Sequence, residues 1–122
     1  MTSSELQDRL IDFAVSIIQL TKTIKFDIAV KVMLNQLLRS GTSTALNYGE
    51  AVGAESSNDF VHKMQIVLKE LRETYVALTI IKKADMCNEI EKLSVVLDEN
   101  NQLISIFVKS ITTNKMKKAG KR

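Results

Sequence analysis

The stretch from Arg39 to Phe60 reads Arg-Ser-Gly-Thr-Ser-Thr-Ala-Leu-Asn-Tyr-Gly-Glu-Ala-Val-Gly-Ala-Glu-Ser-Ser-Asn-Asp-Phe and contains three of the four glycines of the chain. Small residues recur there every four positions, at Gly41, Ala45, Gly49 and Gly53. In a helix this spacing places them along one face, where another backbone can approach closely. Each glycine costs about 1 kcal/mol of helix stability relative to alanine, so a packing contact is expected to offset that cost. Packing between helices of one bundle is the favoured explanation; a subunit interface comes second and a phosphate cradle last.

The same predicted helix carries a line of polar residues, which consists of Arg39, Ser40, Ser43, Asn47 and Glu50. Asn47 and Glu50 are three positions apart and therefore share a face. Two explanations stay open: a solvated face, or a hydrogen-bond network that is buried or lies at an interface. Eleven residues separate Arg39 from Glu50, about 16 Å along a helix, so the partner of Arg39 is expected on another helix or subunit.

Four segments have apolar residues at helical spacing, namely residues 3–23, 28–54, 57–84 and about 88–113. Each is preceded or opened by a residue that caps helix N-termini, in order Thr2, Asp27, Ser56 and Asn88. The chain has no proline, which argues against an all-β fold with its frequent turns. Short connections between long helices predict an all-α fold, an antiparallel up-down-up-down four-helix bundle over residues 1–113.

Two features of the last predicted helix depart from the regular pattern. The run Asn100-Asn101-Gln102 interrupts its apolar stripe, so local solvation or a contact between subunits is expected there. Residues 114–122 form a basic tail that is expected to be disordered. Its positive residues are Lys115, Lys117, Lys118, Lys121 and Arg122, and without these five the chain has 12 basic and 14 acidic residues, a balance of −2. The tail either contacts RNA phosphates in a salt-dependent way or is a solubilising end.

Motifs for catalysis are absent from the sequence. His62 is the one histidine and is expected at the surface, and Cys87 is the one cysteine, without a histidine near it in sequence. There is no Glu-x-x-His pair for a di-iron bundle and no Gly-x-Ser-x-Gly motif. We therefore expect no enzyme activity, metal, cofactor or small-molecule substrate. No signal peptide or membrane-spanning run is recognised, and a single cysteine fits a reducing compartment, so a cytoplasmic location is expected.

Several motifs resemble one bacterial family. They are Gln36-Leu-Leu-Arg-Ser-Gly-Thr-Ser, Asn47-Tyr-Gly-Glu-Ala, Ala54-Glu-Ser, Asp59-Phe-Val-His-Lys and Leu68-Lys-Glu-Leu-Arg-Glu-Thr-Tyr. Together with the chain length and the number of helices, they resemble the four-helix-bundle proteins encoded in intervening sequences of 23S ribosomal RNA genes. Positions that match the pattern of this ribosomal-protein-like family are Arg39, Ser40, Ser43, Asn47, Glu50, Ala51 and Phe60.

The resemblance implies a bundle that assembles into a ring-shaped homopentamer. It also implies similarity to the accessory proteins of diversity-generating retroelements, which bind nucleic acid and a reverse transcriptase. The leading expectation is therefore an oligomer that binds structured RNA, such as ribosomal RNA, or a ribonucleoprotein. A protein–protein interaction scaffold without affinity for nucleic acid is the alternative. Many family members carry an arginine where this chain has Gly49, so an RNA contact through that arginine would be missing here.

Overall fold

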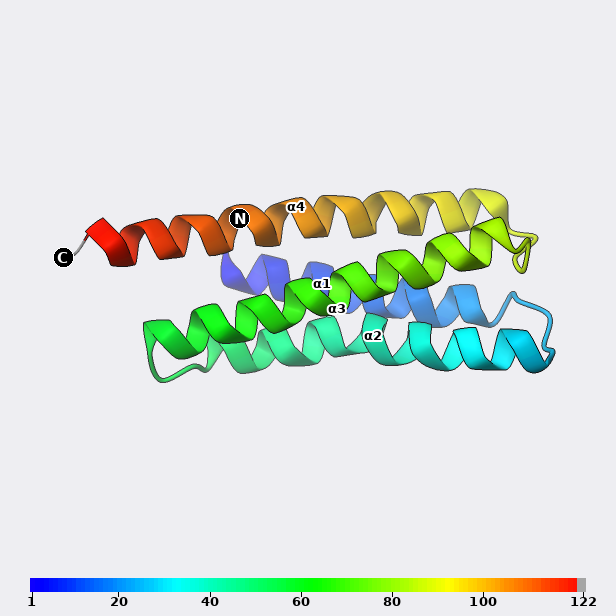
Figure 1. Ribbon diagram of the computed structural model, residues 1–122, viewed down its shortest axis with the longest axis horizontal. Helices are drawn as coiled ribbons and strands as arrows, with labels where there is room; N and C mark the ends of the chain where they lie inside the picture. Colours follow the sequence, from blue (N-terminus) through cyan, green and yellow to red (C-terminus); the bar gives the residue numbers. More distant parts are fainter. Residues whose placement is uncertain (121–122) are drawn as a thin grey trace.

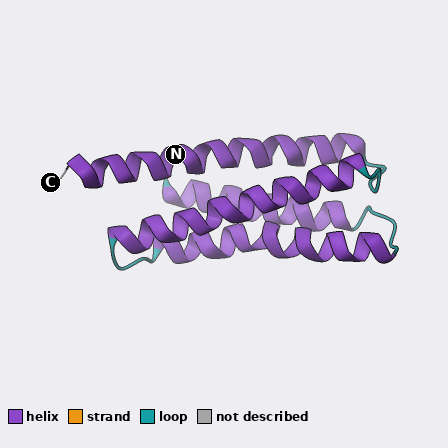
Figure 2. Ribbon diagram, viewed as in Figure 1, coloured by secondary structure: helices purple, strands orange, loops and turns teal. Residues whose placement is uncertain are grey.

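Four helices make up the structure, a computed structural model that describes residues 1–120 (Figures 1 and 2). Their bounds are Ser3–Thr21 for α1, Ile28–Val52 for α2, Ser57–Lys83 for α3 and Ile90–Gly120 for α4. No strand occurs among the described residues. Successive helices run in opposite directions and pack in the order α1, α2, α3, α4, with the least contact between α1 and α4. The predicted all-α, antiparallel four-helix bundle is confirmed.

Three of the four predicted helix caps are confirmed. The side chains of Thr2, Asp27 and Ser56 accept hydrogen bonds from the backbone N–H three residues later, at 3.1, 2.8 and 3.1 Å. Each satisfies a donor that the first turn of a helix leaves unpaired. The fourth prediction was wrong, because α4 begins at Ile90 and the side chain of Asn88 makes no hydrogen bond within residues 1–120.

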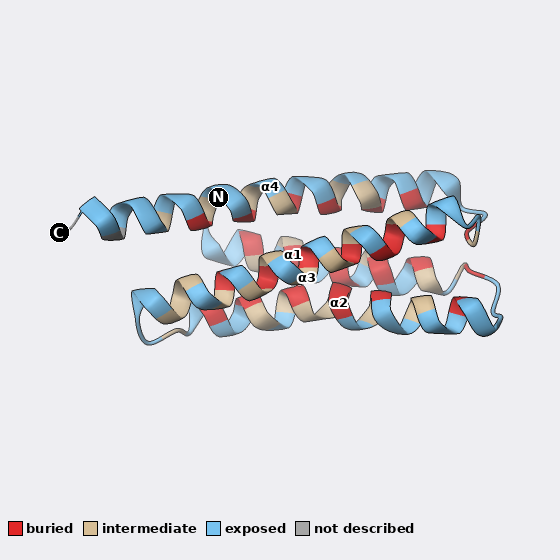
Figure 3. Cartoon of the chain, in the orientation of Figure 1, coloured by how far each residue is buried: buried red, intermediate tan, exposed pale blue. Residues whose placement is uncertain are grey.

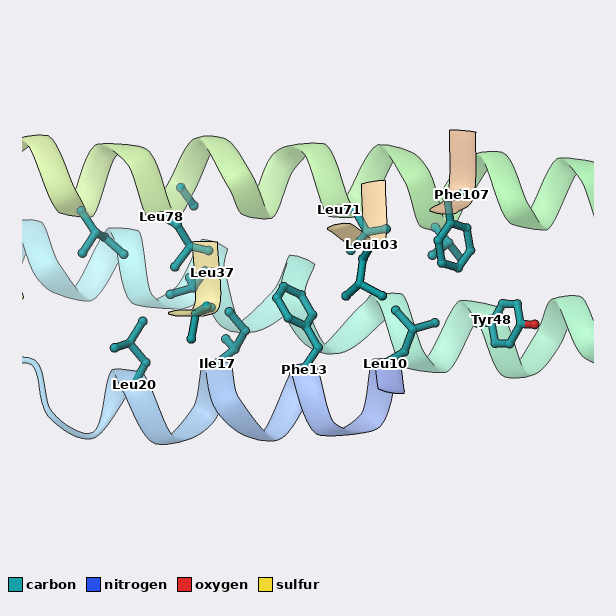
Figure 4. Close-up of a cluster of buried hydrophobic side chains, with 14 of the residues drawn as sticks. Leu10, Phe13, Ile17, Leu20, Leu37, Tyr48, Leu71, Leu78, Leu103 and Phe107 are labelled. Atoms are coloured by element: carbon teal, nitrogen blue, oxygen red, sulfur yellow. The ribbon is translucent and has the colours of Figure 1, made fainter. Parts of the chain in front are cut away.

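The core is a continuous layer of apolar side chains from all four helices (Figures 3 and 4). Figure 4 shows aliphatic and aromatic side chains meeting between the helices, and the fully buried ones include Leu10, Phe13, Leu37, Leu71 and Phe107. Towards the end of the bundle where α2 finishes, the rings of Tyr48 and Phe107 pack edge to face with their centres 5.7 Å apart. Burial raises the pKa of the Tyr48 hydroxyl above its ordinary value.

The fourth helix is longer than expected. It continues as a helix to Gly120, seven residues past the expected end at residue 113, so residues 114–120 are helical where disorder was predicted. Figure 1 shows that its last turns reach beyond the ends of the other three helices. Lys121 and Arg122 lie outside the described residues.

Candidate functional site

Arg39 lies where the outer surfaces of α2 and α3 meet. Its guanidinium group donates to the carboxylates of Glu70, at 3.1 Å, and Glu73, and it also approaches the side-chain oxygen of Gln36 at 3.5 Å. The hydrogen bond to Glu73 and the charge of Glu70 raise the pKa of Arg39 above its ordinary value. The expectation that Arg39 pairs with another helix is thus confirmed, and the partners are two glutamates one turn apart on α3.

Beneath this ion cluster, two hydroxyl groups join α2 to α3 in the interior. The side-chain oxygens of Ser40 and Thr74 are 2.9 Å apart, and both residues are almost completely buried. The Thr74 hydroxyl also lies 2.8 Å from the backbone oxygen of Glu70. Since a hydroxyl carries a single hydrogen, Thr74 donates to that carbonyl while Ser40 donates to Thr74. The pair therefore satisfies polar groups that would be costly to bury alone.

The other members of the predicted polar line do not join the same network. The Asn47 side chain donates to the backbone oxygen of Ser43 at 2.9 Å, and the Ser43 hydroxyl donates to the backbone oxygen of Ser40, also at 2.9 Å. Both bonds stay within α2. Glu50 is exposed and lies 3.4 Å from the amino group of Lys63 on α3. The line is therefore a connection from Arg39 and Ser40 to α3, a local pair at Ser43 and Asn47, and a surface ion pair at Glu50.

We expect Arg39→Ala to lower the free energy of unfolding by about 1 kcal/mol, because it leaves Glu70 and Glu73 close together without a counter-charge. Half of the Arg39 side chain is exposed, so added salt should reduce the loss. The matched control is Glu50→Ala, which removes one exposed ion pair and should change stability by less than about 0.5 kcal/mol. Chemical unfolding at low and high salt measures both; equal losses for the two variants would contradict the assignment.

The small residues of α2 face α1. A Cβ atom placed on Gly41 would lie 3.1 Å from both γ carbons of Ile17, so glycine permits close contact between the two helices. At Ala45 the backbone oxygen accepts a hydrogen bond of 3.0 Å from the Gln7 side chain, and a Cβ on Gly49 would lie 3.3 Å from the Gln7 side-chain oxygen. Gly53 follows the last residue of α2 and packs against no other helix. The favoured prediction of close packing within one bundle is confirmed at Gly41. At Ala45 and Gly49 the contact with α1 is made through the flexible side chain of Gln7.

Several polar residues that matter here were not recognised in the sequence. The spacing of apolar residues in the segment 57–84 places Glu70 and Glu73 on its outer face, and it assigns no role to Thr74. Arg9 on α1 forms a two-pronged ion pair with Glu99 on α4, at 2.7 and 2.8 Å, where these two helices otherwise make the least contact. The only signal in the sequence was the spacing of Glu70 and Glu73 by one helical turn, which suits a shared partner but does not name it.

Three of the five basic residues of the predicted tail, Lys115, Lys117 and Lys118, lie on α4. Lys115 and Lys117 are exposed, and neither takes part in an ion pair found within residues 1–120. No group of three or more His, Cys, Asp or Glu side chains in this part of the chain is arranged to hold a metal ion. No helix within residues 1–120 is both long and apolar enough to cross a membrane.

A comparison with family models matches residues 3–108 to the family described as 23S rRNA-intervening sequence protein. The chain belongs to this family. A solved structure of a protein with unknown function, from the S23 ribosomal protein family of Bacteroides thetaiotaomicron VPI-5482, has 31% sequence identity and a TM-score of 0.80. The alignment covers 92% of the present chain and 99% of the Bacteroides chain. No match was found among curated proteins. The match to the family model includes the α2–α3 contact and ends before the basic turns of α4.

Proposed function

We propose that this member of the 23S rRNA-intervening sequence protein family is a non-enzymatic, cytoplasmic oligomer that binds structured RNA, or a ribonucleoprotein, through the basic end of α4. The homopentamer implied by the family resemblance is the assembly we propose. The observation that supports RNA binding is the separation of charge along the chain. Residues 100–122 contain six basic residues and no acidic residue, whereas residues 1–99 contain 11 basic and 14 acidic residues. The chain thus combines a segment of +6 with a body of −3.

The position of this segment favours contact with a polyanion. The last turns of α4 reach past the ends of the other helices (Figure 1), and Lys115 and Lys117 near this end are exposed. Positive side chains near a helix C-terminus are also favoured by the helix dipole, which helps a lysine-rich end to remain helical. Phosphate contacts of this kind bind with little sequence preference, because they release counterions rather than read bases. A preference for structured RNA would then come from the spacing of basic ends in the assembled oligomer.

The test measures binding of a labelled 23S ribosomal RNA fragment by fluorescence anisotropy, at about 50 mM and about 200 mM salt. The double variant Lys115→Glu with Lys117→Glu should weaken binding by about tenfold or more. Its salt dependence should also be smaller, because fewer phosphate contacts release fewer counterions on binding. The matched control reverses Lys82 and Lys83, an exposed pair at the other end of the bundle, and should change the affinity by less than about twofold.

Three outcomes would count against this proposal. Equal losses in the two double variants would show that binding follows total charge and not the end of α4. Binding that the Lys115 and Lys117 reversals leave unchanged would place the RNA site elsewhere on the bundle. Absence of binding at the lower salt concentration would favour the alternative, a protein–protein interaction scaffold without affinity for nucleic acid.

A further inference from the structure

An open groove runs along the outer surface between α2 and α3, with a volume of about 910 Å³. Its floor is mainly apolar and includes Met33 from α2 and Leu68, Val76 and Ile80 from α3. Val76 and Ile80 are 57% and 42% exposed, so this part of the bundle leaves a sizeable apolar surface in water. The ion pair of Arg39 and Glu73 lies in the same groove and links the two helices that form its walls.

The groove also carries positive charge. Lys69 and Arg72 line it from α3, one helical turn apart, and neither takes part in an ion pair found within residues 1–120. Arg39 is different, because two carboxylates already neutralise its charge. Lys69 and Arg72 therefore give the groove a net attraction for an acidic partner. A phosphate backbone fits less well, since the floor is apolar and Glu73 lies within the groove.

The outer face of α1 has complementary properties. Ile11, Val15 and Ile18 follow one another at spacings of four and three residues, and each is 37 to 46% exposed. Asp8 and Asp12 lie one turn apart beside this apolar line, both are exposed, and none of the ion pairs found within residues 1–120 uses them. An apolar line at this spacing is the pattern of a helix that docks into a groove, and the aspartates beside it suit a positively charged groove.

We infer that α1 of one copy of this chain docks into the α2–α3 groove of a second copy. Ile11, Val15 and Ile18 cover the apolar floor, while Asp8 and Asp12 meet Lys69 and Arg72. The two charge pairs have similar but not equal spacings, about 6 Å along α1 between Asp8 and Asp12 and about 4.5 Å along α3 between Lys69 and Arg72. The inner face of α1 is already used, since Leu10, Phe13 and Ile17 are buried in the core of their own bundle. The inference rests on the proposed oligomer and names its contact surfaces.

This contact joins two different surfaces of the same molecule. Such an interface is heterologous, so every copy offers one α1 face and one groove, and repeated addition closes a ring or extends a filament. The basic end of α4 takes no part in the contact and stays available in every subunit. A ring built this way would present several lysine-rich helix ends, in agreement with the RNA-binding proposal.

The test reverses charges on each surface and then on both. Asp8→Lys with Asp12→Lys, or Lys69→Glu with Arg72→Glu, should each weaken self-association by about tenfold or more, because like charges then face each other. The quadruple variant should regain association, since opposite charges meet again. Sedimentation velocity over a range of protein concentrations measures the assembly. Circular dichroism establishes that each variant is helical. The matched control is Glu91→Lys with Asp98→Lys, two exposed acidic positions on α4.

A second pair of variants tests the apolar part of the contact. Val15→Glu should weaken association, whereas Val95→Glu, the same change at a more exposed valine on α4, should not. Association that is unaffected by both surface reversals would overturn this inference while leaving an oligomer built through other faces. A wild-type chain that stays monomeric would overturn it together with the proposed oligomer. RNA binding is measured in a separate experiment. A chain that assembles but does not bind RNA would contradict the RNA-binding proposal alone.

Discussion

Replacing Gly41 with leucine is expected to lower the free energy of unfolding by about 3 kcal/mol, in the range that overfilling a packed interior costs. The Cβ atom alone would lie 3.1 Å from two carbons of Ile17, which is already tighter than ordinary contact. Ile17 is completely buried and branched at Cβ, so it has few other rotamers available. The rest of a leucine side chain would therefore push α2 away from α1. Thermal and chemical unfolding, followed by circular dichroism, measure the loss.

Gly49→Ala provides the control for this variant. Its added Cβ would meet only the flexible end of the Gln7 side chain, at 3.3 Å, and the position is exposed. Alanine is the better helix former by about 1 kcal/mol, so stability should stay the same or increase by up to that amount. A Gly41→Leu protein that unfolds like the wild type would show that α1 and α2 are not held at this separation. Both variants keep the net charge of the chain, so electrostatics cannot explain a difference.

The parts of the fold that depend on neighbouring residues could be predicted from the sequence. The caps at Thr2, Asp27 and Ser56 use bonds to a residue three positions later, so the pattern lies within one short window. Asn88 has the same appearance, yet α4 begins two residues further on and leaves it outside the helix. The position of a helix start inside a short loop depends on how the next helix packs, and local capping chemistry does not contain that information.

For the polar contacts between helices, the sequence predicts that a residue pairs with another helix but not which residue is its partner. The sequence indicated that Arg39 pairs outside its own helix, but the choice of Glu70 and Glu73 depends on the relative height and rotation of α2 and α3. The same holds for Ser40 and Thr74, which lie 34 residues apart in the chain. A single sequence specifies which face of each helix is apolar, but it does not specify how two faces are aligned along their length.

Asn100 is the clearest such case. The run Asn100-Asn101-Gln102 was expected to be solvated or to meet another subunit, and for Asn100 the expectation of solvation was wrong. Asn100 is 0% exposed, whereas Asn101 and Gln102 are exposed as expected. The Asn100 amide donates to the backbone oxygen of Leu71 on α3 at 3.0 Å, and its own oxygen has no partner among residues 1–120. A polar interruption in an apolar stripe thus marks a buried bond between α3 and α4.

Asn100→Asp should therefore destabilise the protein by about 3 to 5 kcal/mol at neutral pH, as an uncompensated buried charge does. The two side chains have nearly the same shape, but the carboxylate has no N–H to donate and faces the carbonyl oxygen of Leu71. Asn100→Leu tests the opposite change. It removes the unpaired oxygen and leaves the Leu71 carbonyl in the hydrogen bonds of α3, so stability should increase by about 1 kcal/mol.

The destabilisation by Asn100→Asp should also depend on pH. Burial raises the pKa of the introduced carboxyl group in the folded protein above the value of about 3.9 that it has in the unfolded chain. Between these two values the folded state holds more protons, so stability falls as pH rises and levels off above the folded pKa. Near pH 4 the neutral acid can donate its O–H to Leu71 as the amide does, and most of the loss should disappear. Chemical unfolding of the wild type and of Asn100→Asp across this pH range measures the difference in their free energies of unfolding. The wild-type amide does not titrate, so it adds nothing to the pH dependence of this difference. A difference in stability between the two proteins that is the same at every pH would contradict this prediction. It would mean that the carboxylate rotates out to face the solvent, and that the bond between α3 and α4 is not enclosed.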